Sequence, residues 1–131
     1  TPLYSSAASD VYKRQEVCLP DVVSTGLRFR RLSHWQEVRQ GQFGLRLPPP
    51  GPDVCFTAMD LLLVPGVGFD RHGWRLGWGK AYYDRFLAGC PAPAWGVAWT
   101  CQVVDELPHA EHDARLHGLV TADGLTRFAQ S

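Results

Sequence analysis

The fold of this chain is decided by the stretch from Asp60 to Asp84, DLLLVPGVGFDRHGWRLGWGKAYYD. Its first six residues form a continuous apolar run that closes on proline and glycine, which is typical of a strand buried on both faces of a parallel sheet. Its last residues change to a helical period, because aromatic and apolar residues recur four positions apart in YYDRFL, and a glycine and a proline follow. The stretch therefore predicts a strand, a glycine-rich loop and a helix that begins near Gly79.

The loop between these two elements combines backbone freedom with positive charge. Gly73, Gly77 and Gly79 leave no side chain in the way, so a ligand can approach the main-chain N–H groups closely. The unpaired N–H groups at a helix start favour an anion, and Arg75 and Lys80 add full charges at the same place. Glycines, cations and a helix start in this order indicate a site for a phosphorylated nucleotide.

The glycine spacing alone matches neither of the common phosphate motifs. Lys80 is followed by Ala81 rather than by serine or threonine, so the loop is not a Walker A sequence. The triplet Gly77-Trp78-Gly79 lacks the third glycine of the dinucleotide fingerprint. An ordinary strand-to-helix turn with solvated cations is the alternative that these residues leave open.

Composition and charge restrict the class of protein. Thirteen basic and thirteen acidic residues give a formal net charge of zero, so no long-range field attracts nucleic acid or an anionic membrane. No apolar segment approaches transmembrane or signal-peptide length. The four cysteines show no C-x-x-C spacing, and we expect reduced, packed thiols in a cytoplasmic protein that acts as a monomer.

A longer segment of the sequence resembles a known family. Residues 65–87, PGVGFDRHGWRLGWGKAYYDRFL, resemble the signature of 5-formyltetrahydrofolate cyclo-ligases, also called methenyltetrahydrofolate synthetases. VCLP at residues 17–20 and LPHAEHDARLHGLVT at residues 107–121 resemble further segments of the family in the same order. Ala81 stands where the family usually carries glycine, and Leu47 stands where it tends to carry a polar or acidic residue. The family's basic N-terminal helix has no counterpart here, so the resemblance is to an N-terminally truncated member.

The resemblance implies an ATP-dependent conversion of 5-formyltetrahydrofolate to 5,10-methenyltetrahydrofolate, with ATP and reduced folate as the small-molecule partners. It implies that Arg75 and Lys80 act in catalysis and that Asp84 and Asp113 hold Mg2+, a hard cation that takes carboxylates and phosphate oxygens. The implied substrate-binding residues are Trp78, Gly79, Lys80, Ala81 and Tyr82. The implied ATP-binding residues are Arg75, Leu76, Gly77, Trp78, Gly79, Lys80, Ala81, Tyr82 and Tyr83.

Several alternatives stay open at the level of the residues. Asp84 also suits a helix-surface carboxylate, and Asp113 a loop acid beside Arg115. Trp74 and Trp78 suit either a planar pterin or adenine ring or packing against the helix. Other functional classes are an inactive fragment that retains a nucleotide-phosphate-binding loop, and another α/β enzyme such as a sugar-phosphate isomerase.

The pattern along the chain predicts an α/β fold, a three-layer sandwich around a mostly parallel sheet that lacks an N-terminal portion. Residues 1–15 differ in character from the rest and are set apart as a leader, which leaves residues 16–131 as a partial cyclo-ligase-like domain. Strands are expected at 16–23, 29–32, 94–99 and 119–121, with a short helix or a structured loop at 33–42. Residues 45–53, with four prolines, are expected to form a stiff connection, and 123–130 a terminal helix.

Overall fold

The computed structural model describes residues 15–23, 26–41, 44–77, 82–111 and 113–129. The chain divides into two compact units, residues 1–54 and residues 55–131, and each is described by itself. Residues 1–14, nearly all of the expected leader, lie outside the described residues. In the described part of the chain no helix is long and apolar enough to cross a bilayer.

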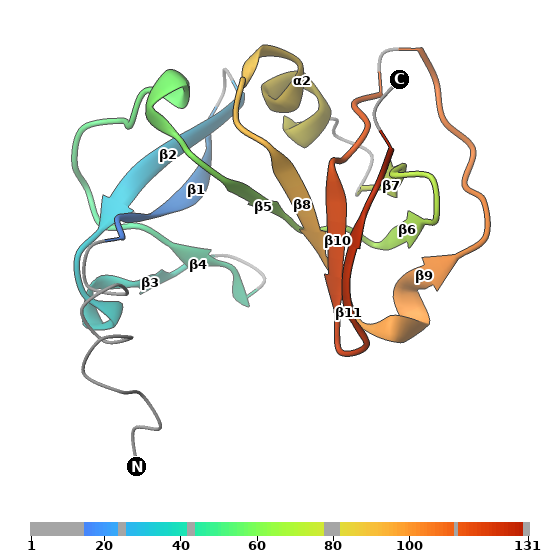
Figure 1. Cartoon of the computed structure of the whole chain (residues 1–131). Coiled ribbons are helices and arrows are strands. Elements are labelled where there is room, and N and C mark those ends of the chain that lie inside the picture. The colour runs from blue at the N-terminus through green and yellow to red at the C-terminus, as the bar shows by residue number, and fades with distance from the viewer. Residues whose placement is uncertain (1–14, 24–25, 42–43, 78–81, 112, 130–131) are drawn as a thin grey trace. The chain divides into compact units, whose positions relative to one another are not determined.

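The first unit is built on an antiparallel hairpin of two seven-residue strands, β1 (Val17–Val23) and β2 (Gly26–Leu32). Leu27 and Phe29, two positions apart, lie on one face of β2 and are buried, and Leu32 at the end of the strand is buried as well. Both strands were expected from the sequence, and their pairing is confirmed (Figure 1).

The remainder of the first unit holds short elements. A single 3-10 turn, η1 (Trp35–Glu37), precedes β3 (Arg39–Gln40), which pairs antiparallel with β4 (Arg46–Leu47). The prediction that residues 45–53 contain no element is therefore wrong for β4. The prolines begin only at Pro48, after the two residues that pair, so they end β4 rather than prevent it.

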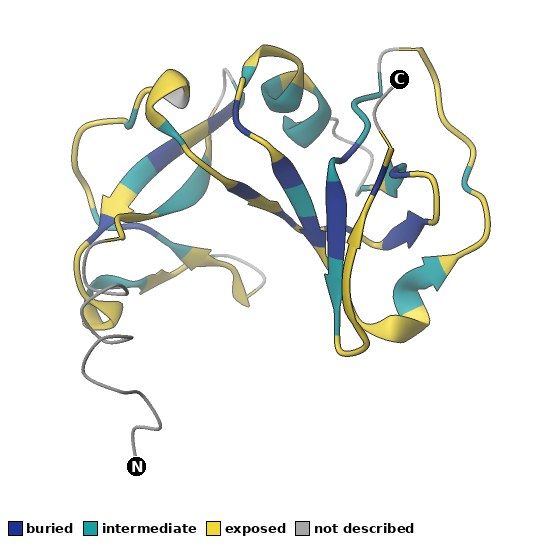
Figure 2. Ribbon diagram, in the orientation of Figure 1, coloured by how far each residue is buried: buried dark blue, intermediate teal, exposed yellow. Residues whose placement is uncertain are grey.

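The second unit contains a four-stranded sheet in the order β11-β10-β8-β5. Its centre is parallel, because β8 (Ala94–Val97) pairs in parallel with both β5 (Leu62–Val64) and β10 (Gly118–Thr121). Burial alternates along β5, where Leu63 is exposed between two buried residues, so the expected burial on both faces is wrong (Figure 2). The molecule is a mixed α/β protein with several small sheets.

The expected terminal helix is replaced by a strand. Residues Gly124–Arg127 form β11, which pairs antiparallel with β10 through a two-residue turn at Ala122 and Asp123. Gly124 has a φ of +126°, a backbone conformation that favours glycine, and the Asp123 N–H donates to the Thr121 hydroxyl. Pairing with β10, with a glycine at a positive φ at the start of β11, prevailed over the predicted helix cap.

Two segments that leave the same edge of this sheet form a second, smaller sheet. After β5 the chain makes the antiparallel pair β6 (Gly68–Asp70) and β7 (Arg75–Leu76). After β8 a 3-10 turn, η4 (Thr100–Gln102), leads to β9 (Val103–Val104), which pairs in parallel with β6 (Figure 1). The expectation that the glycine loop and the segment leading to Asp113 start from one sheet edge is thereby confirmed, although the β6–β7 hairpin inside the loop was not predicted.

In the described part of the second unit, one α-helix, α2 (Tyr82–Gly89), follows the glycine loop. The helix stops at the predicted glycine, two residues before Pro91. One further 3-10 turn, η3 (Phe56–Ala58), opens the unit. The core consists of apolar residues from the strands and from the segments between them. Its buried members are Leu62, Val64, Phe69, Ala92, Ala94, Leu116, Leu119 and Phe128.

Candidate functional site

The centre of the candidate site is the guanidinium of Arg75 on β7. The side chain is only 4% exposed, although arginine is among the residues least often buried. Its Nη1 donates a hydrogen bond of 3.0 Å to the Pro65 carbonyl oxygen, and its Nη2 lies 3.8 Å from Asp84 Oδ1. The guanidinium carbon lies 5.3 Å from the centroid of the Tyr83 ring, in the geometry of a cation–π contact. β7 and the first turn of α2 thus supply this cluster together.

Two glycines make room for this side chain. A Cβ atom at Gly66 would lie 2.9 Å from Arg75 Cγ, and one at Gly77 would lie 2.9 Å from Arg75 Nη1. The glycines of the loop therefore serve the arginine as well as any ligand, which the sequence pattern alone did not indicate. Arg75 Nε is buried and has no hydrogen-bond partner in the described part of the chain. An N–H group of this kind is suited to an incoming acceptor oxygen.

The charges around Arg75 are balanced by carboxylates from two segments. Burial lowers the pKa of the Arg75 guanidinium below its ordinary value, while Asp84, then Tyr83 and then Asp113 act electrostatically in the opposite direction. Asp113 is held in its loop by Ala110, whose N–H donates to Asp113 Oδ2 at 2.8 Å. One buried cation therefore lies within the electrostatic reach of both predicted metal ligands.

This donor set fits the magnesium ion that the resemblance implies. Mg2+ is bound in proteins by one or two carboxylates, with phosphate oxygens and waters completing its shell. Asp84 and Asp113 provide two carboxylates, and Arg75 beside them suits the phosphate that would share the ion. No group of three or more metal-ligating side chains occurs among the described residues.

Tyr83 gives the cluster a pH dependence that can be measured. Burial raises the pKa of the Tyr83 phenol above its ordinary value of 10.0, against the opposing effect of the Arg75 charge. Because the folded state holds this proton more tightly than the unfolded state, its contribution to stability is complete below pH 10 and is lost as the pH rises further. We expect the melting temperature to fall above about pH 10.

Tyr83→Phe should reduce the fall in melting temperature at alkaline pH. In a spectrophotometric titration, one of the four tyrosines of the wild type should ionise at a higher pH than its ordinary value, and this delayed step should be absent from Tyr83→Phe. Tyr82→Phe is the matched control, since it removes the neighbouring phenol and should leave the delayed step in place. Equal alkaline titrations of the wild type and Tyr83→Phe would contradict this assignment.

A buried carboxylate that the sequence analysis did not select lies at the end of β6. Asp70 is 0% exposed, and its Oδ1 accepts hydrogen bonds of 2.9 Å from the N–H groups of His72 and Trp74. Its Oδ2 accepts a third bond of 2.9 Å from the N–H of Leu107, on the segment that leads to Asp113. The carboxylate therefore joins the two segments that supply the cluster. The only signal in the sequence was an aspartate that ends an apolar run before a turn.

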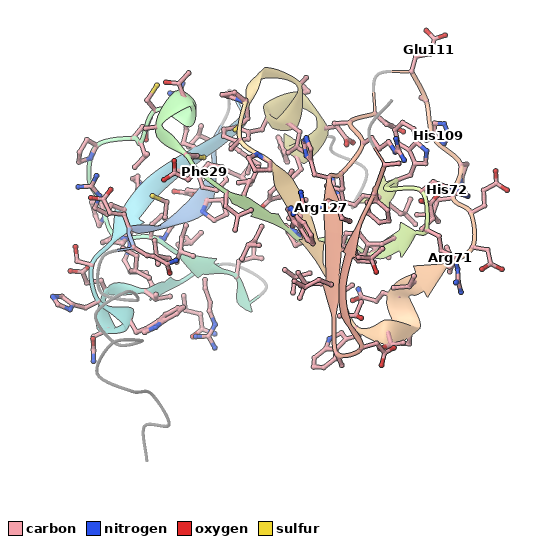
Figure 3. All side chains as sticks on the ribbon, viewed as in Figure 1. Phe29, Arg71, His72, His109, Glu111 and Arg127 are labelled. Carbon is pink, nitrogen blue, oxygen red and sulfur yellow. The ribbon has the colours of Figure 1, made fainter. Side chains whose placement is uncertain are left out.

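The same two segments meet at an aromatic stack. The rings of Trp74 and His109 are parallel within 8°, with centroids 3.8 Å apart. Beside them lies a surface cavity of about 460 Å3 that His72, Glu106 and Arg115 also line; Figure 3 shows His72 and His109 on neighbouring loops. Trp74 therefore stacks on a histidine of the second loop, a contact that the sequence did not predict.

The structure brings together four of the predicted site residues. Arg75, Tyr83, Asp84 and Asp113 belong to one electrostatic cluster. Tyr82 lies on another face of α2, where its ring contacts Arg85 at 5.3 Å, and Leu76 is 47% exposed. The predictions for Trp78, Gly79, Lys80 and Ala81 lie outside the described residues.

Comparison with known proteins places this geometry in a family. The model of the 5-formyltetrahydrofolate cyclo-ligase family matches residues 9–122. The chain belongs to this family. A relative from Mycolicibacterium smegmatis, named 5-formyltetrahydrofolate cyclo-ligase, is 36% identical over 66% of this chain and 50% of its own length. The mouse relative of the same name is 35% identical over 87% of this chain and 64% of its own length.

Solved structures agree with the family assignment. The 5,10-methenyltetrahydrofolate synthetase of Aquifex aeolicus superposes with a TM-score of 0.77 at 35% identity, covering 94% of this chain and 63% of that one. The synthetase of Mycoplasma pneumoniae superposes with a TM-score of 0.64 at 26% identity, covering 88% of this chain and 62% of that one. The chain thus spans about half to two thirds of the length of these members of the family.

Proposed function

We propose that this chain carries the nucleotide and metal half of a 5-formyltetrahydrofolate cyclo-ligase. The observation that supports it is the buried Arg75 guanidinium, which has an unpartnered Nε in the described residues and two carboxylates in its field. A buried arginine beside acidic ligands is the arrangement that a magnesium-bound phosphate requires. Membership of the family gives this arrangement its substrates, ATP and a reduced folate.

The basic and the acidic residues have different roles in this proposal. Arg75 and Lys80 compensate the negative charge of the transferring phosphoryl group, and the loop from Arg75 to Tyr83 surrounds the triphosphate. Asp84 and Asp113 would hold Mg2+, which when bound neutralises phosphate charge and orients the oxygens. Residues 78–82 contact the folate, with Tyr82 on its side of α2.

The reaction that these groups serve needs alignment more than covalent participation by the protein. The formyl oxygen of 5-formyltetrahydrofolate attacks the γ-phosphorus of ATP, and ADP leaves. The neighbouring nitrogen of the folate then attacks the activated carbon, and inorganic phosphate leaves to give 5,10-methenyltetrahydrofolate. Placement and electrostatic stabilisation account for both steps, so no serine or cysteine nucleophile is required.

The finer features of the fold and setting are part of the same proposal. The parallel strands β5, β8 and β10 support a three-layer sandwich around a mostly parallel sheet. Residues 16–131 are proposed as the cyclo-ligase-like domain and residues 1–15 as the leader. The four cysteines, which show no C-x-x-C spacing, support a cytoplasmic location, and we propose a monomer.

A second candidate is an inactive fragment that binds a nucleotide phosphate without turnover. It is favoured by one observation, that the chain spans only 50% to 64% of its relatives from Mycolicibacterium and mouse. The two candidates share the Arg75 cluster and differ in whether the folate is converted.

Calorimetry with Mg2+ and ATP, together with the absorbance of the methenyl product, tests both candidates. Binding with product formation supports the enzyme, and binding without product supports the fragment. Asp84→Asn and Asp113→Asn should each weaken binding of the magnesium complex by about tenfold or more, because each removes a charged ligand. Lys80→Ala should abolish turnover and leave the fold intact.

The matched control is Asp123→Asn, which makes the same change in the exposed turn between β10 and β11, where Asn-Gly is as suitable as Asp-Gly. It should bind like the wild type. A wild-type chain that binds no magnesium–ATP complex would refute the proposal in both forms.

A further inference from the structure

The feature that the proposed reaction leaves unused is the carboxylate of Asp70. It is the one buried carboxylate among the residues that the structure describes. The carboxylate accepts hydrogen bonds from three backbone N–H groups, two from the turn after β6 and one from Leu107, which lies 37 residues further along the chain. An anion in this environment is retained only because these donors replace the water that it has lost.

The donors belong to the two segments that carry the charged cluster. The turn at His72 and Trp74 leads directly into Arg75, and the segment that begins at Leu107 leads to Asp113. Asp70 Oδ1 faces the first segment and Oδ2 faces the second, so one rigid carboxylate group spans both. Its own main chain is anchored in β6, which pairs with β7 on one side and with β9 on the other.

Other contacts also join the two segments. Arg71 and Asp105 form an ion pair of 2.8 Å, but their side chains are 70% and 90% exposed, so water screens it. The Trp74–His109 stack lies at the surface, where His109 is exposed. Beyond Asp113, the Leu116 N–H donates to the Gly73 carbonyl oxygen at 2.8 Å, and Arg115 Nε donates to the His72 carbonyl oxygen. The Asp70 carboxylate is the buried group that holds the segment before Asp113, at Leu107.

We propose that Asp70 is a positioning residue, whose carboxylate holds the β6–β7 turn and the segment from Leu107 to Asp113 at the separation that lets Arg75 and Asp113 act on one phosphate–metal group. This inference rests on the proposed function for its consequence, and on the three hydrogen bonds for its geometry. Asp70 itself touches no reacting atom. Loss of the Asp70 contacts should therefore reduce the factor by which Mg2+ tightens ATP binding, in addition to any loss of folding stability.

The sharpest test removes one donor and leaves the carboxylate in place. Leu107→Pro removes the backbone N–H that donates a hydrogen bond to Asp70 Oδ2. Because residue 107 precedes Pro108, its backbone is already restricted to extended conformations that proline can adopt. Leu107→Ala is the matched control, because it loses the same side chain and keeps the N–H. We expect Leu107→Pro to bind magnesium–ATP roughly tenfold to a hundredfold more weakly than Leu107→Ala.

The specific readout is the ratio between the dissociation constants for ATP measured in a chelator and in Mg2+. That ratio should fall in Leu107→Pro and stay at the wild-type value in Leu107→Ala. A merely structural role would lower the melting temperature of Leu107→Pro and leave the ratio unchanged in the folded protein, and this outcome would overturn the inference.

Hydrogen exchange tests the same inference without relying on nucleotide binding. Asp70→Asn replaces one acceptor oxygen by an N–H2 group, so the amides of His72, Trp74 and Leu107, which donate to the carboxylate, should exchange faster than in the wild type. Asp105→Asn is the control, since it breaks the exposed ion pair between the same segments, and it should leave these amides protected. Unchanged protection of the Leu107 amide in Asp70→Asn would overturn the inference. A wild-type chain that fails to bind magnesium–ATP refutes the proposed function instead, and the exchange arm still decides whether Asp70 joins the segments.

Discussion

Substituting Arg75→Met is expected to weaken or abolish binding of the magnesium–ATP complex, with a loss on the order of 10² to 10³-fold in any turnover. Methionine keeps much of the apolar stem but removes the planar cation that lies 4% exposed between Asp84 and the Tyr83 ring. The substitution also leaves Asp84 without its cationic partner, which adds like-charge repulsion against a triphosphate. Calorimetry with magnesium–ATP measures the first effect, and product absorbance measures the second.

Arg85→Met is the matched control for this experiment. Arg85 also contacts a tyrosine ring of α2 at 5.3 Å, but its residue is exposed and it contacts Tyr82 rather than Tyr83. Losing an exposed cation–π contact costs about 0.5–1 kcal/mol of stability and should leave nucleotide binding unchanged. If Arg75→Met and Arg85→Met bind magnesium–ATP equally well, Arg75 is not the phosphate ligand.

The second large effect is expected from Gly96→Ala in the centre of the parallel sheet. A Cβ atom there would lie 2.6 Å from one carbon of the Phe69 ring and 3.0 Å from Leu119 Cδ1. Phe69 is 1% exposed and Leu119 is 5% exposed, so neither can move aside into solvent. Overpacking of this kind costs about 1–3 kcal/mol, which outweighs the roughly 0.5–1 kcal/mol that alanine gains over glycine in a regular element. Urea unfolding should show the lower free energy.

Gly89→Ala gives the opposite expectation and serves as the control. No heavy atom lies within 4 Å of a Cβ atom built at Gly89, and the residue is the last of α2. Only the gain in helix propensity applies there, so the free energy of unfolding should stay equal or rise. If Gly96→Ala and Gly89→Ala had equal free energies of unfolding, the packing around Phe69 would be looser than in the structure.

Arg75 was selected from its own chemistry, as a cation in a glycine loop beside a helix start, and Asp84 was selected through the resemblance to the cyclo-ligase family. The functional roles of both residues stay predictions. Asp70 was not selected, because its function lies in three backbone N–H groups, one of them 37 residues away, that no side-chain pattern records. The stacking of the His109 ring on Trp74 was not predicted either, because the two residues lie on segments distant in the sequence.

The errors in the fold have the same origin. Apolar residues in β5 and β8 predicted strands correctly, since a short apolar run between turn signals has few alternatives. The residues after Thr121 suit either a capped helix or a hairpin, and pairing with β10 decided for the strand. The burial of Leu62 and Val64 but not Leu63 was equally undecided by composition, because an apolar side chain does not indicate which face of a sheet is covered.

The sequence by itself determined the strands β1, β2, β5, β8 and β10, the helix after the glycine loop, the family, and the types of residue that a phosphate and a metal ion would need. These follow from local periodicity, from turn residues and from motif chemistry, which act over a few neighbouring positions. Only the tertiary structure decided that Arg75 is enclosed by Gly66, Gly77 and Tyr83, and that Asp70 joins the two segments on which the charged cluster lies. Burial and backbone hydrogen bonding between distant segments arise only when the chain closes on itself, and they turn separate charges into one site.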